Sequence, residues 1–173
     1  SSYDKNNTLK YNFNGELSVF DHTYSYKATG TRLMLYPSIE YPMRNIGWEL
    51  TPKLGIKHRS YSISRGSDNN ITDTTPILSL RGKMIFDKMK TNNILQTLEP
   101  EMFFLYVPAS NQDAIPIFDA GDNDLKYNLF SENRFYGEDR LNDAKQLTLA
   151  LSSSVIDTAS GNELLRGTIG QIF

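Results

Sequence analysis

Residues 96–108 read Gln-Thr-Leu-Glu-Pro-Glu-Met-Phe-Phe-Leu-Tyr-Val-Pro, and a long polar stretch follows them before alternation resumes at Leu147. Apolar and polar residues alternate at the start of this run with the period of two that is typical of a β-strand. An irregular connection as long as 109–145 is uncommon in a compact soluble domain. Transmembrane β-barrels have such connections, because their loops are long on the outer side and short on the inner side. The stretch therefore predicts a barrel strand followed by a long outer loop, 109–145.

The same alternation recurs along the rest of the chain. About seven strands are predicted, in the runs Leu9–Val19, Arg32–Tyr41, Trp48–Lys57, Leu78–Asp87, Thr97–Val107, Gln146–Val155 and Leu164–Phe173. The polar connections after the first, third and fifth runs, at 21–30, 64–75 and 109–145, are predicted to be longer than the others. This sorting favours a sheet that crosses a bilayer. The predicted fold class is all-β, an antiparallel transmembrane β-barrel segment that forms a single domain over residues 1–173.

Composition excludes several classes of protein. The chain has 173 residues, is 39% hydrophobic and carries a net charge of −2, with no cysteine. No apolar run approaches the roughly 20 residues of a membrane helix. The absence of cysteine excludes disulfides, thiol catalysis and cysteine-ligated metals within this segment. No basic cluster of the kind that binds nucleic acid is present, so we expect no nucleic-acid partner.

No motif for bond-making chemistry is found. The Asp122-Asn123-Asp124 run in the acidic loop lacks the spacing of a calcium-binding loop. His22 and His58 cannot form a metal site on their own, and no motif selects a nucleophilic serine. We therefore expect no catalytic residue, no cofactor and no metal, and the chain is not expected to be an enzyme.

The polar positions of the strands are expected to line the barrel lumen. The candidate lumen or partner contacts among them are Lys53, Lys57, Arg81, Lys83, Glu99 and Glu101. Their signs are mixed, whereas a substrate filter would tend toward one sign. The pattern leaves two interpretations: a solvated wall with compensating charges, or a surface that contacts a partner or plug.

Several short motifs resemble one known family. They are Leu98-Glu99-Pro100, Tyr106-Val107-Pro108, Tyr136-Gly137 with Asp139-Arg140, Gln146, and Gly170-Gln171. Together with matches upstream, they make most of residues 30–173 similar to the LptD (organic solvent tolerance protein) family of lipopolysaccharide (LPS)-assembly proteins. Asp139 and Arg140 are also expected to fix the fold of the long loop through charge-assisted hydrogen bonds.

The resemblance implies a role in LPS transport and assembly, with LPS inserted into the outer leaflet of the outer membrane of a Gram-negative bacterium. It implies that the chain is a middle section of a much larger β-barrel, surrounded by outer-membrane lipids. The implied partners are an LptE-like lipoprotein in the lumen, LPS itself, and a periplasmic LptA-like bridge that acts through a domain not in this chain.

Two other classes remain open at this stage. One is a small outer-membrane porin or adhesin-type barrel that ends on Phe173, although Gln171 interrupts the apolar alternation expected there. The other is a soluble β-sandwich binding module.

Overall fold

The predicted all-β, antiparallel fold is confirmed. The computed structural model describes residues 8–24, 28–65, 70–91, 93–122 and 129–173. Within these ranges every regular element is a strand. The described part of the chain contains no helix that is long and apolar enough to cross a membrane.

Seven long strands form the main sheet, in the order β1-β2-β4-β5-β7-β10-β11. Each of these strands therefore lies beside the long strand that precedes it in the sequence. Their bounds are β1 Lys10–Phe20, β2 Thr29–Glu40, β4 Trp48–Arg65, β5 Asn70–Met84, β7 Ile94–Val107, β10 Ala144–Asp157 and β11 Asn162–Ile172. Two short strands, β3 Met43–Asn45 and β6 Phe86–Thr91, extend the sheet by pairing with β4 and β7. Two residues each in β8 Gly121–Asp122 and β9 Phe135–Tyr136 form a second small sheet.

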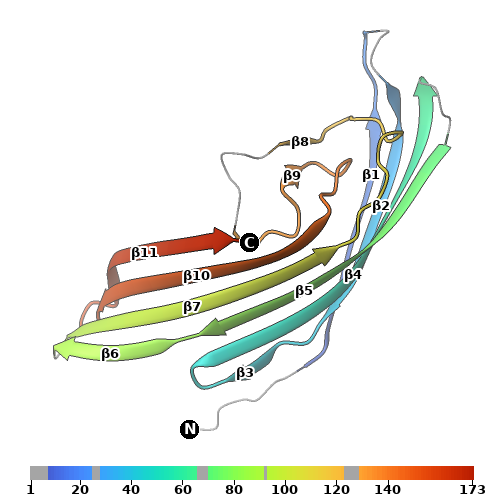
Figure 1. Cartoon of the computed structure of the whole chain (residues 1–173). Helices are drawn as coiled ribbons and strands as arrows, with labels where there is room; N and C mark the ends of the chain where they lie inside the picture. Colours follow the sequence, from blue (N-terminus) through green and yellow to red (C-terminus); the bar gives the residue numbers. More distant parts are fainter. Residues whose placement is uncertain (1–7, 25–27, 66–69, 92, 123–128) are drawn as a thin grey trace.

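The sheet is open and strongly bent. Figure 1 shows β1 and β2 standing nearly upright, β4 and β5 curving from the upper right to the lower left, and β7, β10 and β11 running at a shallow slope. The segment between β7 and β10 lies in the bend, where it carries β8 and β9. Such coiling follows from the right-handed twist that accumulates across many strands.

The two faces of the sheet differ in composition because side chains alternate along each strand. The apolar face is exposed, and its members include Tyr11, Phe13, Leu33, Leu54, Leu78, Phe104, Leu149 and Ile169. The polar face is largely covered, and its buried members include Arg32, Arg59, Thr75, Ser79, Glu99 and Thr148. A sheet in water has the reverse arrangement, with the apolar face packed on a core.

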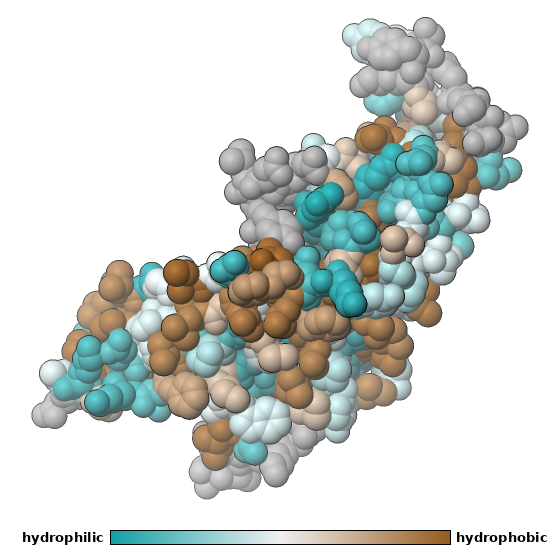
Figure 2. Space-filling model, in the orientation of Figure 1, coloured by the Kyte–Doolittle hydropathy of each residue, from teal (hydrophilic) through white to brown (hydrophobic). Residues whose placement is uncertain are grey.

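Figure 2 shows one side of the molecule. Hydrophilic side chains gather at the upper right, over β1, β2 and the adjoining part of the long loop, while hydrophobic ones extend across the middle. Hydrophobic and hydrophilic side chains are thus sorted into regions on this surface.

The predicted connection 64–75 is wrong. Strand β4 continues to Arg65 and β5 begins at Asn70, in unbroken register from Trp48 opposite Met84 to Ser62 opposite Asn70. Residues 66–69 lie outside the described residues. The connection after the third run is therefore short. The connection 108–143 is much longer than the others. It begins one residue before the predicted loop 109–145 and ends two residues before it does.

A pair of prolines explains where β7 leaves the sheet. Strands β5 and β7 pair from Lys83 opposite Glu101 to Leu78 opposite Tyr106. If this pairing continued in the same register by two more residues, Pro76 would lie opposite Pro108. Neither proline has an N–H to donate to the ladder, so pairing ends there and the long connection begins.

The long connection, residues 108–143, packs onto the polar face and encloses two small apolar clusters. Leu141 of the connection and Ala144 of β10 lie with Phe103, Leu105 and Ile77 in one cluster, which also contains Val107. Ile115 lies with Tyr61 and Ile63 in the other, and Phe118 packs against it. The ring of Phe118 also stacks on Phe20, with 4.4 Å between ring centroids. The buried apolar core of the described structure thus lies between the sheet and its longest connection.

Replacement of Leu105 by alanine should lower the free energy of unfolding by about 2–5 kcal/mol, because the side chain is fully buried and its loss leaves a cavity. Urea titration followed by circular dichroism would measure the change. Leu149→Ala is the matched control on the apolar face, where the side chain is 45% exposed and no enclosed cavity would form. Equal losses for the two variants would contradict the assignment of the core.

Candidate functional site: the polar face and its docked loop

Arg32 of β2 is the centre of the contact between the sheet and the long connection. Its side chain is fully buried, and its two terminal nitrogens meet three carboxylates. Nη1 donates to Asp139 Oδ1 at 2.6 Å, and both nitrogens donate to Asp119 at 2.7 Å. Nη2 also donates to Glu16 of β1 at 2.7 Å. Two separate parts of the connection thus converge on one strand residue.

Asp139 links that arginine to the backbone of the connection. Its Oδ2 accepts hydrogen bonds from the backbone N–H groups of Phe118 and Asp119, both at 2.7 Å. Arg59 of β4, also fully buried, donates to the Asp139 backbone oxygen at 2.9 Å and forms an ion pair with Asp73 of β5. We call Arg32, Arg59, Asp119 and Asp139 the loop latch.

A second set of contacts holds the connection closer to the middle of the sheet. Glu132 accepts a hydrogen bond from the Tyr36 hydroxyl at 2.6 Å and forms an ion pair with Lys53 at 3.0 Å. Lys57 forms an ion pair with Glu138. Lys53 and Lys57, predicted as candidate lumen or partner contacts, therefore lie against the chain's own connection.

Arg140 acts within the connection. Its guanidinium donates to the backbone oxygens of Gln112 at 3.0 Å and Ile115 at 2.9 Å. The Gln112 side chain in turn donates to the Leu141 backbone oxygen at 2.7 Å and accepts from the Leu141 N–H at 3.0 Å. These bonds tie residues 112–115 to residues 140–141, so the start and the end of the connection are joined.

Gly137 has the backbone geometry that the latch needs. Its φ of +72° is in the left-handed region, where residues with a Cβ are strained. A Cβ at this position would also lie 2.6 Å from the Asp119 backbone oxygen. The neighbouring Tyr136 places its hydroxyl over Gly121, on the other strand of the small sheet.

The Asp119 carboxyl has a lowered pKa. Hydrogen bonds from the Arg32 guanidinium stabilise its charged form and bring the pKa from 3.8 to about 2, although partial burial opposes the shift. The ionised form is therefore the one that docks the connection onto the sheet.

The remaining predicted motif residues are divided between the two faces. Leu98, Pro100 and Tyr106 point to the apolar face, as does Gln171, which pairs with Leu149. Glu99 and Gln146 lie on the polar face. Gly170 faces the connection, since a Cβ there would lie 2.6 Å from Leu129. Pro108 marks the end of β7.

One part of the polar face carries charged residues of both signs, and the connection meets it where the Arg81 guanidinium lies 5.0 Å from the centre of the Phe130 ring. We call Glu49, Arg81, Lys83, Glu99 and Glu101 the charged stretch. Arg81 pairs with Glu101, and Lys83 pairs with Glu99 at 2.7 Å. The Arg81 side chain is 54% exposed, so the charged stretch remains accessible in part.

The structure offers no metal site among the residues it describes: no group of three or more histidine or acidic residues could hold an ion there. Of the Asp122-Asn123-Asp124 run, the Asp122 side chain and residues 123–124 lie outside the described part.

The sequence did not single out Arg32, Arg59 and Asp119 as a site. Arg32 and Asp119 are 87 residues apart, and Arg32 and Asp139 are 107 apart. The available signal had two parts. Arg32 is at a polar position of β2 with no acidic residue beside it in sequence, and the long connection is rich in acidic residues, whose charge is opposite to that of arginine.

Asp139→Ala should release the long connection, because Arg32 would lose a buried partner and three backbone N–H groups, those of Phe118, Asp119 and Ala120, would lose their acceptor. Breaking a buried ion pair costs about 3–5 kcal/mol. Faster trypsin cleavage after Arg134 would report the release. Asp143→Ala, at an exposed position of the same connection, is the control and should leave the cleavage rate unchanged. Equal rates for the two variants would show that the latch does not hold the connection.

Acidification should undock the connection near Asp119. Because the folded-state pKa is lowered, the stabilisation is complete above about pH 4 and is lost as the pH falls from 3.8 toward about 2. Pepsin cleavage of residues 108–143, followed between pH 4 and pH 2, would measure this. In Asp119→Asn the pH dependence over this range should weaken; an unchanged profile would assign the effect to other groups.

The comparisons with known proteins agree with the sequence resemblance. The family model of LptD, "LPS transport system D", matches residues 2–173. The LPS-assembly protein LptD of Aromatoleum aromaticum is 40% identical over 168 residues, which are 93% of this chain and 21% of that protein. That of Nitrosococcus oceani is 39% identical over 95% of this chain and 23% of its own length. That of Neisseria meningitidis serogroup A is 39% identical over 83% of this chain and 19% of its own length.

The chain thus spans about a fifth of the length of these relatives. It belongs to the LptD family of LPS-assembly proteins.

Proposed function

We propose that this chain forms part of the wall of an outer-membrane β-barrel that assembles LPS into the outer leaflet. The observation that carries the proposal is the inverted sheet: an exposed apolar face and a covered polar face, in a chain of the LptD family. Lipid would contact the first face, and the lumen would adjoin the second. The family's name supplies the link to LPS.

The apolar face is suited to a bilayer. It exposes large side chains on every long strand, such as Phe13 on β1, Leu54 on β4 and Leu149 on β10. Contiguous apolar surface on this scale is rare on soluble monomers. The long strands have 11–18 residues, enough for a tilted strand to cross the hydrocarbon core.

Both ends of the sheet are suited to continuation into a larger barrel. Within the described residues, β1 pairs with β2 alone and β11 pairs with β10 alone. Each therefore presents a row of backbone groups that a further strand can pair with. Closure into a barrel removes such edges, which otherwise favour aggregation. This supports a segment of a barrel over the small porin-type or adhesin-type barrel and over the soluble sandwich, neither of which the family membership favours.

The long connection would form an outer loop that folds back into the lumen. Its contacts with Arg32, Lys53 and Lys57 hold it on the polar face. In this role it narrows the outer end of the lumen and limits the passage of solutes.

The charged stretch would adjoin a partner in the lumen, an LptE-like lipoprotein. Its paired, mixed charges are suited to a protein surface with complementary polar groups. Contact with a periplasmic LptA-like bridge would require a domain that is not in this chain.

Cysteine labelling tests the arrangement of the two faces: this chain has no cysteine, and any cysteine elsewhere in the full-length protein would be replaced by serine. In outer-membrane vesicles, a water-soluble maleimide should label Thr51→Cys on the polar face and should not label Leu149→Cys on the apolar face. Unfolding in urea should make both cysteines reactive, which controls for intrinsic reactivity. Rapid labelling of Leu149→Cys in the native vesicles would show that this face meets water and not lipid.

Depletion tests the link to LPS. Loss of the full-length protein should reduce the amount of newly made LPS at the cell surface, and the wild-type gene should restore it. Unchanged surface LPS after depletion would overturn the proposed function.

The full-length protein with Asp119→Ala combined with Asp139→Ala should admit large hydrophilic antibiotics, because the loop would no longer narrow the lumen.

A further inference from the structure

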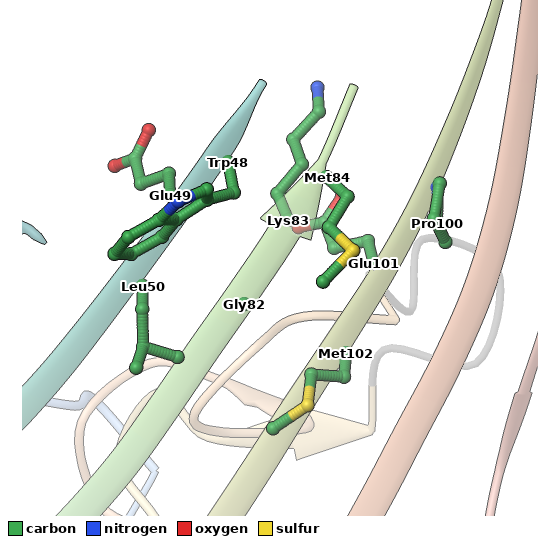
Figure 3. Close-up of a pocket in the computed structure, with 9 residues that line it drawn as sticks. All are labelled: Trp48, Glu49, Leu50, Gly82, Lys83, Met84, Pro100, Glu101 and Met102. Carbon is green, nitrogen blue, oxygen red and sulfur yellow. The ribbon is translucent and has the colours of Figure 1, made fainter. Parts of the chain in front are cut away.

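A groove crosses the apolar face where β4, β5 and β7 run side by side. We call it the Gly82 groove; its apolar lining residues are Trp48, Leu50, Gly82, Met84, Pro100 and Met102. Figure 3 shows Leu50 and Met102 on either side of Gly82, with Trp48 and Met84 at one end. The groove has a volume of about 330 Å³.

Gly82 lies at the floor of the groove. Gly82 pairs with Leu50 on β4 and with Met102 on β7, so the three positions lie in one row across the apolar face. Leu50 and Met102 form the walls, and the glycine forms the floor between them. A Cβ at Gly82 would lie only 3.1 Å from Met102 Cγ and 3.4 Å from Leu50 Cδ1, so these two side chains already lean over the glycine. A larger side chain at this position would have to displace them and would narrow the groove.

The charged neighbours do not face the groove. Glu49 and Lys83 alternate with its lining residues and pair on the polar face, Glu49 with Arg44 and Lys83 with Glu99. Glu101 pairs there with Arg81. The groove thus offers dispersion contacts and no ionic partner, which suits a flexible hydrocarbon chain.

Its position is at the end of the sheet opposite the loop latch. Trp48 begins β4 directly after the turn at Gly47, and the Ile85 N–H donates to the Gly47 backbone oxygen at 2.7 Å across the short connections. Short connections are on the periplasmic side of outer-membrane barrels, and tryptophan favours the interface between hydrocarbon and headgroups. The lipid of the periplasmic leaflet is phospholipid.

From this geometry we propose that the Gly82 groove binds one acyl chain of a periplasmic-leaflet phospholipid, with the headgroup beside Trp48. The inference rests on the proposed membrane function, and it adds a defined lipid site to the apolar face. The groove holds its ligand longer than the surrounding surface because the chain is contacted on three sides.

Bromine quenching of Trp48 fluorescence tests the site, since Trp48 is the one tryptophan of this chain. The full-length protein, with tryptophans outside this chain replaced by phenylalanine, would be placed in nanodiscs of phosphatidylethanolamine with brominated acyl chains. We expect strong quenching of Trp48 that is largely lost in Gly82→Leu. Gly167→Leu is the matched control: it makes the same substitution on the apolar face of β11, where a Cβ has no neighbour within 4 Å.

Native mass spectrometry supplies a second readout that does not depend on Trp48. After gentle removal of the nanodisc, the wild type and Gly167→Leu should retain a phospholipid that Gly82→Leu lacks. Identical quenching and identical lipid retention in all three proteins would overturn the site. Shielding of Trp48 from brominated lipid in the wild type would also overturn it, because a protein segment would then fill the groove.

A second reporter separates this inference from the proposed function. In a second protein, with Trp48→Phe and Ile56→Trp, the new tryptophan lies on the apolar face of β4 opposite Pro76, and neither position lines the groove. If residue 56 is quenched in this protein, and Gly82→Leu has no effect on the quenching of Trp48 in the first protein, the membrane wall stands and the groove site is removed. Absence of quenching at residue 56 would remove both.

Discussion

The buried guanidinium of Arg32 imposes the strictest requirement on this structure. A buried charge costs several kcal/mol unless it is paired and hydrogen-bonded. Arg32 obtains its partners from Glu16 on the neighbouring strand and from Asp119 and Asp139, which the long connection supplies. The path of the connection follows from that need. Asp119 and Asp139 must reach the same guanidinium, so the chain between them has to turn back, and Gly137 provides the left-handed residue at which it comes within contact of Asp119.

The latch also accounts for the inverted sheet. Once the connection has packed on the polar face, its ion pairs and the clusters around Leu105 and Tyr61 cover that face. No other segment of the described chain is available to cover the apolar face. Covering this exposed apolar surface with another apolar phase would be strongly favourable, because of the hydrophobic effect. Under the proposed function the hydrocarbon of a bilayer would cover it along the whole width of the sheet, whereas a protein partner would have to match a curved surface that spans seven strands.

The sequence predicted the strands and their two faces well, because a period of two is a local signal and one face is strongly apolar. It failed at 64–75, where serine, threonine, asparagine and aspartate resemble a loop in composition. There the pairing with β4 prevails: Asp73 accepts a hydrogen bond from the buried Arg59 across the strands, and the Thr75 hydroxyl donates to Asp73 within β5. The loop latch could not be predicted from the sequence, for a different reason. Its partners are separated by about half the chain, and only the folded path of the connection brings them together.

Glycines within the strands show how differently the two faces are completed. On the polar face, the space beside Gly55 is filled by the ring of Tyr36, and the space beside Gly170 is filled by Leu129 of the connection. In both cases the chain itself supplies the missing contacts, as close packing requires. On the apolar face, Leu50 and Met102 lean over Gly82 from the two sides, and a groove of about 330 Å³ still remains between the strands. An empty apolar groove forfeits dispersion contacts, and a bilayer can restore them with one hydrocarbon chain. The difference between these glycines is the physical reason to expect a bound lipid at Gly82 and none at Gly55 or Gly170.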